Sequence, residues 1–540
     1  MKQAKAPILR SRTYLYLTEF FAGMAVMAVE LGASRLLAPY FSSSQIVWTI
    51  IIATIMIAMA LGNVYGGRSA DRDPDPDRLY RRLLIAAVWI AAIPLLGRYV
   101  ILGISGLLVF AVSHNLLVIA AFLACMVIFV FPCFLLGTVT PSLVKYAVDS
   151  LDDSGRTVGN LNAFNTVGSI IGTFLPTFVT IPAVGTAVTF LIFSGVILVL
   201  ALVYFISRRA RAAGCIIAVV LFALCAALGS GSRFAFWEED LTYEGESVYN
   251  YLQVRETEDD VTLSTNVLFG VQSILAKDGR LSGMYYDYAM AAPVMARAGG
   301  CPAEEKVLVL GMGSGTYAHQ CAGYLPSLEV TGVEIDSRIT DLARRYFDLP
   351  AESAVITYDG RAYLAAVEEK YDVILVDAYQ DITIPFQMSS VEFFRLVKEH
   401  LNPGGVMVVN MNMRTGDEKG INGYLRDTIA SVFPWVTTVD VPRYTNRELF
   451  AADAAPDTAA FRKALEELSA PLEGDDRREL TGFLTAVWDR LTDYEPGGRL
   501  LTDDRAPVEL LGMRAIDVLI ADELAYYRAQ GPGALLDLLG

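Results

Sequence analysis

The stretch Val307–Asp377 decides the fold of the catalytic part of this chain: VLVLGMGSGTYAHQCAGYLPSLEVTGVEIDSRITDLARRYFDLPAESAVITYDGRAYLAAVEEKYDVILVD. Apolar runs of strand length alternate with helical patterns, which is typical of a parallel, doubly wound sheet. Ligands of such sheets bind beyond the carboxyl ends of the strands. The predicted strands are Val307–Leu310, Leu328–Val333, Ala354–Thr357 and Tyr371–Val376.

A glycine-rich loop and three acidic residues follow these strands. The loop, Gly311-Met-Gly313-Ser-Gly315, lets the backbone turn tightly and approach a ligand. Glu334 ends the second strand, where an acid accepts hydrogen bonds from ribose hydroxyls. Asp359 ends the third strand, near an expected adenine, and Asp377 ends the fourth, facing the same crevice. The pattern predicts a nucleoside site; the alternative is an α/β core with acidic turns.

The loop favours one class of nucleoside over another. Thr316 follows Gly315 directly, so the third spaced glycine of a dinucleotide-binding motif is missing. No second half of a dinucleotide fold is evident further along the sequence. We therefore expect a single nucleoside with a sulfonium arm, as in S-adenosylmethionine or its decarboxylated form.

Further motifs extend the pattern over roughly residues 244–411. In chain order they are Tyr249-Asn-Tyr-Leu-Gln253, Gln272, Tyr285-Tyr-Asp-Tyr-Ala-Met290, the glycine loop, Val333-Glu-Ile-Asp336, Tyr358-Asp-Gly-Arg361 and Tyr371–Asp377. In this order they resemble the spermidine synthases, a family of polyamine aminopropyltransferases. The resemblance implies a Rossmann-like, methyltransferase-type domain that uses decarboxylated S-adenosylmethionine as co-substrate, with no permanently bound cofactor.

The same resemblance assigns roles to individual residues. It implies that Asp377 accepts a proton from the amine. The methylthioadenosine part of the donor would be held by Gln253, Gly311, Gly313, Gly315, Glu334, Asp359 and Gly360. The candidates for contact with substrate amines are Gln272, Tyr286, Asp287, Ser314, Tyr379 and Gln380.

The chain departs from the family pattern mainly in the part that recognises amines. Family members often carry an aspartate inside the glycine loop, where this chain has Ser314. The family's DxxDP pattern is Asp377-Ala-Tyr-Gln-Asp381 here, with the second aspartate displaced by one residue. We expect the segment Gln380–Ser390 to form a mobile gate over the site. The nucleoside half of the site is therefore better defined by the sequence than the amine half.

The first 230 residues account for the excess of apolar residues in the chain. Of all residues, 54% are hydrophobic, and several apolar windows are long enough to cross about 30 Å of hydrocarbon as helices. No cleavable signal peptide is evident. We expect a polytopic membrane domain, with Ile101–Val112 as a further short span or a surface segment. The seven predicted spans are Leu15–Leu36, Ile46–Tyr65, Leu83–Leu102, Leu116–Leu136, Leu161–Ile181, Ala187–Ile206 and Cys215–Leu228.

Three domains follow from this pattern. Residues 1–232 form the transmembrane helical domain, 233–300 a small antiparallel β module that covers the substrate, and 301–540 the Rossmann-like catalytic domain. The β module is predicted from Tyr249–Glu256, Val261–Phe269 and Val271–Leu275. Downstream, Val391–Leu401 reads as a helix, Asn402–Gly405 as a turn and Val406–Met411 as a strand.

Charge separates the two halves of the chain. Residues 1–234 hold 17 Lys and Arg against 9 Asp and Glu, a net charge of +8. Because the whole chain carries −16, the remainder carries −24. Such an acidic domain repels nucleic acid and attracts cations such as polyamines, although solubility alone also explains it.

The positions of the basic residues conflict with the expected location of the substrate. With seven spans, most basic residues fall on one side, which the positive-inside rule places in the cytoplasm. The last span then delivers the catalytic domain to the outer face of a cell (inner) membrane. Decarboxylated S-adenosylmethionine is expected in the cytoplasm, which favours eight spans or a re-entrant segment.

Other residues carry weaker signals. Cys301 and Cys321 are predicted at the same end of the first strand, where a disulfide is conceivable. Glu19 and Glu30 face one side of the first span, either as interhelical contacts or as part of a cation path. Asp503 and Asp504 are predicted to cap a helix. No cysteine or histidine pattern predicts a metal site, and the sequence leaves open whether the chain forms a homo-oligomer.

The sequence thus predicts a membrane-bound aminopropyltransferase that acts on a diamine such as putrescine and gives spermidine and methylthioadenosine. One alternative keeps the fold but uses intact S-adenosylmethionine for methyl transfer. Another makes the chain a non-catalytic amine transporter or sensor. Its expected partners are small amines, nucleosides and the lipid bilayer, and not nucleic acid.

Overall fold

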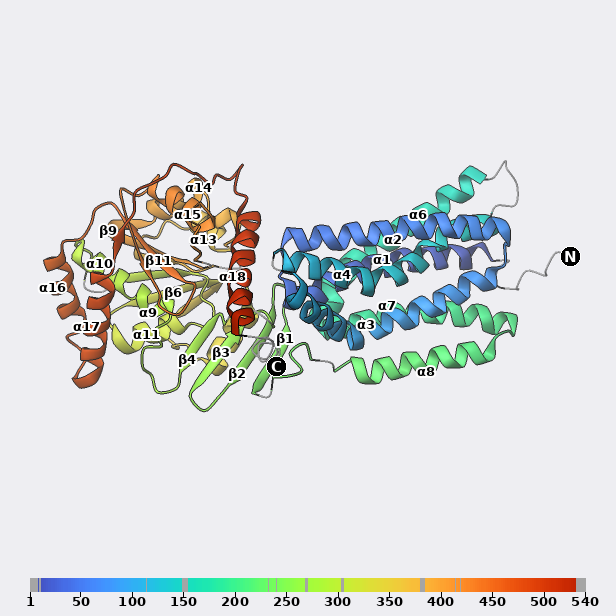
Figure 1. Cartoon of the computed structure of the whole chain (residues 1–540), viewed down its shortest axis with the longest axis horizontal. Coiled ribbons are helices and arrows are strands. Elements are labelled where there is room, and N and C mark those ends of the chain that lie inside the picture. Colours follow the sequence, from blue (N-terminus) through green and yellow to red (C-terminus); the bar gives the residue numbers. More distant parts are fainter. Residues whose placement is uncertain are drawn as a thin grey trace. The chain divides into compact units, whose positions relative to one another are not determined.

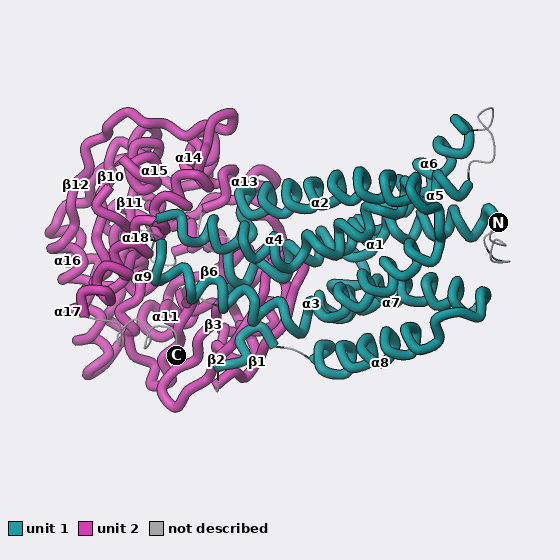
Figure 2. Tube along the Cα trace, turned by 45° about the vertical axis from the view of Figure 1, so that its right-hand side comes forward, with its two compact units in different colours: residues 1–238, 266–268, 539 teal, residues 239–265, 269–538, 540 magenta. Residues whose placement is uncertain are grey.

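The computed structural model divides into two compact units (Figures 1 and 2). It describes residues 8, 11–112, 114–147, 154–231, 233–238, 240–267, 271–302, 305–378, 384–412, 414–417 and 419–530. The first unit, residues 1–238 with 266–268, is helical. The second contains nearly all of the remaining chain, so the β module belongs to the same unit as the large sheet.

The helical unit is built from long apolar helices. All seven predicted spans are helical in the structure. Ile101–Val112 is not a separate segment, because α3 continues without a break to Ala111. The helices are α1 (Arg12–Phe41), α2 (Gln45–Arg72), α3 (Pro76–Ala111), α4 (Leu116–Gly137), α5 (Val139–Ala147), α6 (Ser154–Leu175), the π-helical turn Pro176–Thr180, α7 (Ile181–Arg208) and α8 (Ala212–Gly229).

Six helical stretches in the described residues are long and apolar enough to cross a membrane. One of them, Ser154–Arg208, has 55 residues. A straight helix of that length would measure about 80 Å, far more than the hydrocarbon core of a bilayer. The chain bends within it at Gly185, which has φ 79° and ψ 169°. This bend lies four residues into α7, so the part of α7 after Gly185 takes a different direction from α6 and the π-helical turn.

Contacts with α1 show that α6 and α7 run in opposite directions. Gly168 of α6 lies against Phe20 of α1. One turn further along both helices, Gly172 lies against Met24, so α6 runs parallel to α1. Small residues at this spacing let two helix backbones approach closely.

Helix α7 runs antiparallel to α1. Phe190 near the start of α7 packs on Gly32 near the end of α1. Further along α7, the carbonyl oxygen of Leu200 accepts a hydrogen bond of 2.5 Å from Tyr14, at the start of α1. Among the described residues, the seven predicted spans thus lie in seven long helices, α1–α4 and α6–α8, of which α6 runs parallel and α7 antiparallel to α1.

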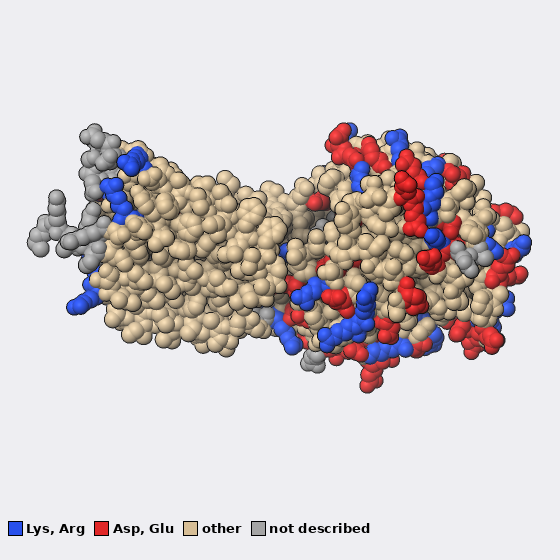
Figure 3. All heavy atoms as spheres, turned by 180° about the vertical axis from the view of Figure 1, so that it is seen from behind, with Lys and Arg blue, Asp and Glu red and all other residues tan. Residues whose placement is uncertain are grey.

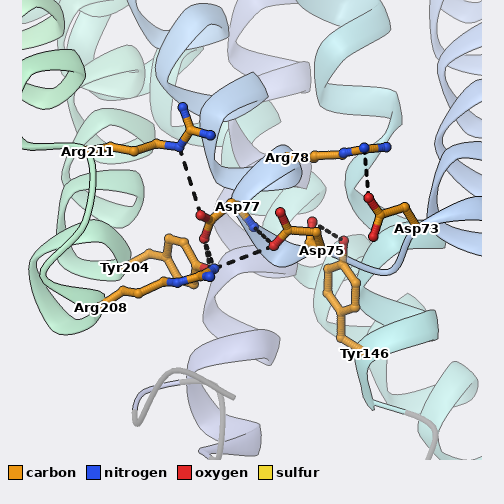
Figure 4. A network of polar contacts seen from close by, with 8 residues as sticks. All are labelled: Asp73, Asp75, Asp77, Arg78, Tyr146, Tyr204, Arg208 and Arg211. Atoms are coloured by element: carbon orange, nitrogen blue, oxygen red, sulfur yellow. Dashed lines mark hydrogen bonds and ion pairs between the residues drawn. The ribbon is translucent and has the colours of Figure 1, made fainter. Parts of the chain in front are cut away.

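A polar network joins α3 and α7 at the end of the helical unit where α1 begins (Figure 4). Asp77, which is 8% exposed, accepts a 2.5 Å hydrogen bond from Tyr204 and forms an ion pair with Arg208. Asp75 accepts a hydrogen bond from Tyr146 of α5 at its carbonyl oxygen. Because Asp77 is nearly buried, the cation beside it offsets much of the cost of removing its charge from water.

The second unit contains a large mixed sheet whose strand order is β12-β10-β11-β9-β8-β5-β6-β7. Five neighbouring strands are parallel: β5 (Lys306–Leu310), β6 (Glu329–Glu334), β7 (Ala354–Thr357), β8 (Tyr371–Val376) and β9 (Leu401–Met411). The four predicted strands are thus confirmed within one or two residues. Three antiparallel strands follow at one edge: β11 (Arg447–Ala452), β10 (Trp435–Asp440) and β12 (Thr492–Asp493).

Helices connect these strands: α11 (Thr316–Tyr324), α12 (Ser337–Tyr346), α13 (Gly360–Ala366), α14 (Val391–Glu399), α15 (Ile421–Ala430), α16 (Thr458–Leu468), α17 (Gly474–Asp489) and α18 (Val508–Gln530), with a 3-10 turn at Phe386–Met388. The predicted turn Asn402–Gly405 is wrong, because these residues lie within β9. They cause a shift of its register against β8 between Tyr371 and Val373.

A four-stranded antiparallel sheet forms the predicted β module. Its strands, in spatial order, are β1 (Leu241–Glu246), β2 (Tyr251–Glu256), β3 (Asp260–Ser264) and β4 (Ser273–Ala276), followed by α9 (Tyr285–Ala289) and α10 (Ala291–Ala298). Strand β3 is shorter than predicted, and the end of that prediction, residues 268–269, lies outside the described residues. Cys301 and Cys321 are both buried and not bonded.

Candidate active site

The end of β5 approaches the end of β8 very closely. Gly311 has φ +92°, and a Cβ built there would lie 2.6 Å from the carbonyl oxygen of Asp377. Both the left-handed backbone and the missing space exclude any larger residue. The backbone nitrogen of Asp377 in turn donates to the carbonyl oxygen of Leu310, at 2.9 Å. The glycine loop and Asp377 are therefore held side by side.

Glu334 and Asp359 stand at the neighbouring strand ends, as predicted. Glu334 is 6% exposed and accepts hydrogen bonds of 3.0 Å from the backbone nitrogens of Gly313 and Asp336. Burial raises its pKa, while these donors favour the charged form. Asp359 caps α13 by accepting a 2.8 Å hydrogen bond from the backbone nitrogen of Ala362. Each carboxylate keeps acceptor positions for a ligand.

Asp377 is a partly buried carboxylate held by two side chains. Tyr285 donates to its Oδ2 at 2.7 Å, and Asn410 donates through Nδ2 to its Oδ1 at 2.9 Å. Burial raises the pKa of Asp377 to about 7, although both hydrogen bonds oppose the rise. A carboxylate with such a pKa can accept a proton near neutral pH.

Neither Tyr285 nor Asn410 is among the predicted site residues. The sequence could have indicated Tyr285, because it directly precedes the predicted residue Tyr286. Asn410 comes near Asp377 only because β9 pairs with β8. Its amide oxygen also accepts a 2.9 Å hydrogen bond from Asn446, which fixes the orientation of the amide.

Asp336 fastens the β module to the large sheet. Its Oδ2 accepts hydrogen bonds from Ser247 at 2.5 Å and from Asn250 at 3.0 Å. Its Oδ1 accepts a hydrogen bond from the backbone nitrogen of Arg338, and Asp336 thereby caps the start of α12. One side chain thus joins the module to the strand that carries Glu334.

The remaining predicted residues of the module differ in position. Gln272 lines the cavity described below and donates to Thr265 at 3.3 Å. Gln253 is 3% exposed in β2, accepts a hydrogen bond from Tyr251 and is not among the lining residues. Tyr286 lines the cavity and donates to the carbonyl oxygen of Ile274.

Asp287 and Ser314 lie outside the cavity lining. Asp287 accepts hydrogen bonds from Ser282 at 3.0 Å and from the backbone nitrogen of Gly283 at 2.6 Å, which stabilises the start of α9. Burial raises its pKa to about 7. Ser314 forms a 2.8 Å hydrogen bond with Thr316. Tyr379 and Gln380, with the first part of the predicted gate, lie outside the described residues.

Asp503 anchors the described part of the gate segment. It forms an ion pair with Arg361 of α13 at 2.6 Å and accepts a 2.5 Å hydrogen bond from Ser390. Arg361 also donates to the carbonyl oxygen of Gln387, at 2.8 Å. The prediction that Asp503 caps a helix is wrong. Its carboxylate instead connects the segment before α18 to Arg361 of α13 and to Ser390 of the gate segment.

These residues surround one cavity of about 1150 Å³, its open mouth included. Gly311 and Gly313 of the glycine loop line it, together with the adenine-side and proton-acceptor candidates and residues of the β module and the gate segment. Gly315 is not among the lining residues and precedes α11. The lining includes Tyr249, Gln272, Tyr285, Tyr286, Gly311, Gly313, Tyr317, Glu334, Asp359, Gly360, Asp377 and Gln387. A parallel sheet with a nucleoside-type cavity at its strand ends defines a Rossmann-like transferase.

The family model and the polyamine aminopropyltransferases among the relatives point to one family. The model of the spermine/spermidine synthase domain matches residues 287–461. A protein of Bifidobacterium longum named "Probable polyamine aminopropyl transferase" is 51% identical over 351 residues, which are 62% of this chain and 77% of that protein. A polyamine aminopropyltransferase of Vibrio vulnificus is 28% identical over 54% of this chain and 98% of its own length.

Among solved structures, a probable spermidine synthase from Corynebacterium glutamicum matches with a TM-score of 0.36 and 21% identity, over 45% of this chain and 94% of its own. Given the extent of the Bifidobacterium match, the chain belongs to the polyamine aminopropyltransferase family, and is a transferase of that kind.

We predict that Gly311→Ala disrupts the site. The added Cβ overlaps the backbone of Asp377 and Ala378, and φ +92° is strained for alanine, so we expect a loss on the order of 2 kcal/mol or more of stability. Gly323→Ala, in helix α11 with open space around its Cβ, is the matched control and should be neutral or stabilising by about 1 kcal/mol. Thermal unfolding and methylthioadenosine binding of the full chain measure both; equal behaviour of the two variants would contradict the prediction.

Proposed function

We propose that this chain is a membrane-bound enzyme that transfers the aminopropyl group of decarboxylated S-adenosylmethionine to a diamine such as putrescine. The products are spermidine and methylthioadenosine. The observation that carries the proposal is the placement of Asp377. It lies partly buried beside the glycine loop and lines the same cavity as Glu334 and Asp359.

In this proposal the strand ends bind the nucleoside. Glu334 accepts hydrogen bonds from the ribose hydroxyls, and Asp359 and Gly360 hold the adenine side. The backbone of Gly313 is open to the cavity, since a Cβ there would meet only Ser273, at 3.8 Å. The β module, fastened through Asp336, covers this site with Gln272 in the wall.

The obstacle to the reaction is the nucleophile, because an alkylammonium ion has no free electron pair at neutral pH. Asp377 accepts a proton from the substrate ammonium group. The amine nitrogen then attacks the propyl carbon next to sulfur, a C–N bond forms, and the C–S bond breaks. Its electron pair goes to sulfur, so methylthioadenosine leaves as a neutral thioether. Holding amine and donor together in one cavity supplies the orientation.

Methyl transfer from intact S-adenosylmethionine is the rival within the same fold, and Ser314, in place of the family's loop aspartate, is the residue that favours it. Incubation of the purified full chain with putrescine and each donor separately, followed by mass analysis, distinguishes the two. We expect a mass gain of one aminopropyl group with the decarboxylated donor. N-methylputrescine as the main product would refute the proposal.

We predict that Asp377→Asn folds and binds methylthioadenosine but loses nearly all turnover. The amide keeps the shape of the carboxylate but cannot accept the proton, which typically lowers the rate by 10²–10⁴-fold. Methylthioadenosine affinity and thermal unfolding of the same sample serve as internal controls. Turnover within about threefold of wild type would remove Asp377 from the reaction.

The pH dependence of turnover should follow Asp377. The base works only when deprotonated, so kcat/KM should fall about tenfold per pH unit below about 7. Tyr285→Phe removes a hydrogen bond that favours the carboxylate, so the pKa of Asp377 rises further and the midpoint moves to higher pH by on the order of 1 unit. Tyr286→Phe, whose hydroxyl bonds to Ile274 instead, should leave the midpoint in place. A midpoint shared by all three proteins would contradict this assignment.

The helical unit supports the membrane part of the proposal. Figure 3 shows one flank of this unit almost without charged side chains, and many of its apolar side chains are exposed, such as Leu107 at 74% and Phe178 at 67%. Apolar surface on this scale requires a covering, and lipid provides it. Of the 14 described Lys and Arg residues in this unit, 11 lie near the helix ends at which α1 begins, and Arg35, Arg98 and Arg233 near the other.

The basic end should face the cytoplasm. With α6 and α7 antiparallel, α8 ends on the opposite side, so we predict the catalytic unit on the outer face, to which the donor must then be supplied. In intact spheroplasts a membrane-impermeant maleimide should label Asp475→Cys but not Asp71→Cys; their side chains are 91% and 71% exposed. Inverted vesicles should give the reverse pattern. Labelling of Asp71→Cys alone in spheroplasts would place the catalytic unit in the cytoplasm.

A further inference from the structure

A second acidic residue lies beside Asp377 and has no role in the mechanism above. Glu448 is in strand β11 and is 0% exposed. Neither of its carboxylate oxygens has a hydrogen-bond partner among the described residues. A buried carboxyl group without a partner is costly, so its retention points to something other than stability.

The sheet places Glu448 next to the proton-acceptor site. Glu448 is directly opposite Asn410 in the antiparallel pair of β11 and β9. Residues opposite each other point to the same face, with Cβ atoms about 5 Å apart. Asn410 is the side chain that donates to Asp377. Glu448 is thus a neighbour of Asn410, the side chain that contacts Asp377.

The surroundings of Glu448 are acidic or phenolic. Glu448 interacts electrostatically with three residues that line the cavity: Asp377, Tyr285 and Tyr317. Its neighbour in sequence, Arg447, is paired with Asp440 at 2.5 Å. Burial and Asp377 together raise the pKa of Glu448 well above its usual range. A cation in the cavity would reverse this balance and favour the carboxylate.

We infer that Glu448 is the counter-charge for the second ammonium group of the acceptor and sets the preference of the enzyme for a diamine over a monoamine. This inference rests on the proposed aminopropyl transfer. One ammonium group gives its proton to Asp377, and the second stays charged and is attracted by Glu448. The sequence pattern of the family does not indicate this residue, since its amine-recognition segment follows Asp377 in the chain, and Asp381 is displaced there.

The effect does not require direct contact. At a separation of about 7 Å and an effective dielectric constant of about 20, one unit charge changes the affinity for another by about 50-fold. This is the upper limit for Glu448, because the cost of ionising its carboxyl group offsets part of the gain. The acceptor distinguished by Glu448 is therefore any α,ω-diamine that places one nitrogen at Asp377 and the other within this range. A monoamine of equal length gains nothing from Glu448.

The test compares Glu448→Gln with Glu305→Gln in the full chain. Glu305 is also 0% exposed with both oxygens unpartnered among the described residues, but it precedes β5, at the opposite end of that strand from the glycine loop. The ratio of kcat/KM for putrescine to that for n-butylamine should fall by up to about 50-fold in Glu448→Gln, mainly through KM, and stay at the wild-type value in Glu305→Gln. An unchanged ratio in Glu448→Gln, or an equal fall in both variants, would overturn the inference.

Direct binding separates this inference from the proposed function. Putrescine should bind to the wild-type protein with methylthioadenosine present, and up to about 50-fold more weakly to Glu448→Gln, as measured by calorimetry. The variant should unfold at the same or a higher temperature, because a costly buried acid has been removed. If wild type binds putrescine but transfers nothing, the proposed function fails while the binding comparison still decides the role of Glu448. Equal putrescine affinity of the two proteins would remove that role.

Discussion

The close approach of the ends of β5 and β8 is the constraint on which the site depends. Because Gly311 leaves no room for a Cβ, the glycine loop turns directly over the backbone of Asp377. The same loop offers the backbone nitrogen of Gly313 to Glu334. Glu334, Asp359 and Asp377 therefore line one cavity. The burial that raises the pKa of Asp377 to about 7 follows from this geometry.

The antiparallel edge of the large sheet completes the site from the other side. Strand β9 supplies Asn410, which orients Asp377, and β11 supplies Glu448 behind it. The result is a pair of acids, Asp377 with two hydrogen-bond donors and the fully buried Glu448 with none among the described residues. The guanidinium of Arg447, the residue before Glu448, is already paired with Asp440. Such a pair of acids is stabilised by a bound cation more than by any neutral ligand. A substrate with two ammonium groups suits this electrostatic arrangement.

The sequence predicts the parallel half of this site well, because each of its carboxylates directly follows a buried strand. Asp377, Glu334 and Asp359 required only the strand pattern and the rule that ligands bind at strand ends. The contributions of Asn410, Glu448 and Asp503 depend on which strands and segments become neighbours after folding, and local periodicity does not show this. Tyr285 and Tyr286 are adjacent in sequence, yet only Tyr285 reaches Asp377, because the start of α9 sets the direction of each ring. The missing break at Ile101 has a simpler cause: apolar residues continue α3 past the length a bilayer requires.

Glu305 and Glu448 show why burial alone is a poor guide to function. Both are fully buried acids without hydrogen-bond partners among the described residues. Burial and Asp372 raise the pKa of Glu305 to about 9, against a smaller opposing effect of Arg297. Asp372 itself already accepts hydrogen bonds from the backbone nitrogen of Lys306 and from Asn402. Glu448 instead faces Asp377, whose carboxylate lines a cavity large enough for a nucleoside. An unpaired acid whose neighbours already have hydrogen-bond partners can remain protonated and neutral, and its burial then only lowers the stability of the protein. An unpaired acid next to a substrate cavity can regain its charge whenever a cation enters, so the same local feature becomes a means of selecting the substrate.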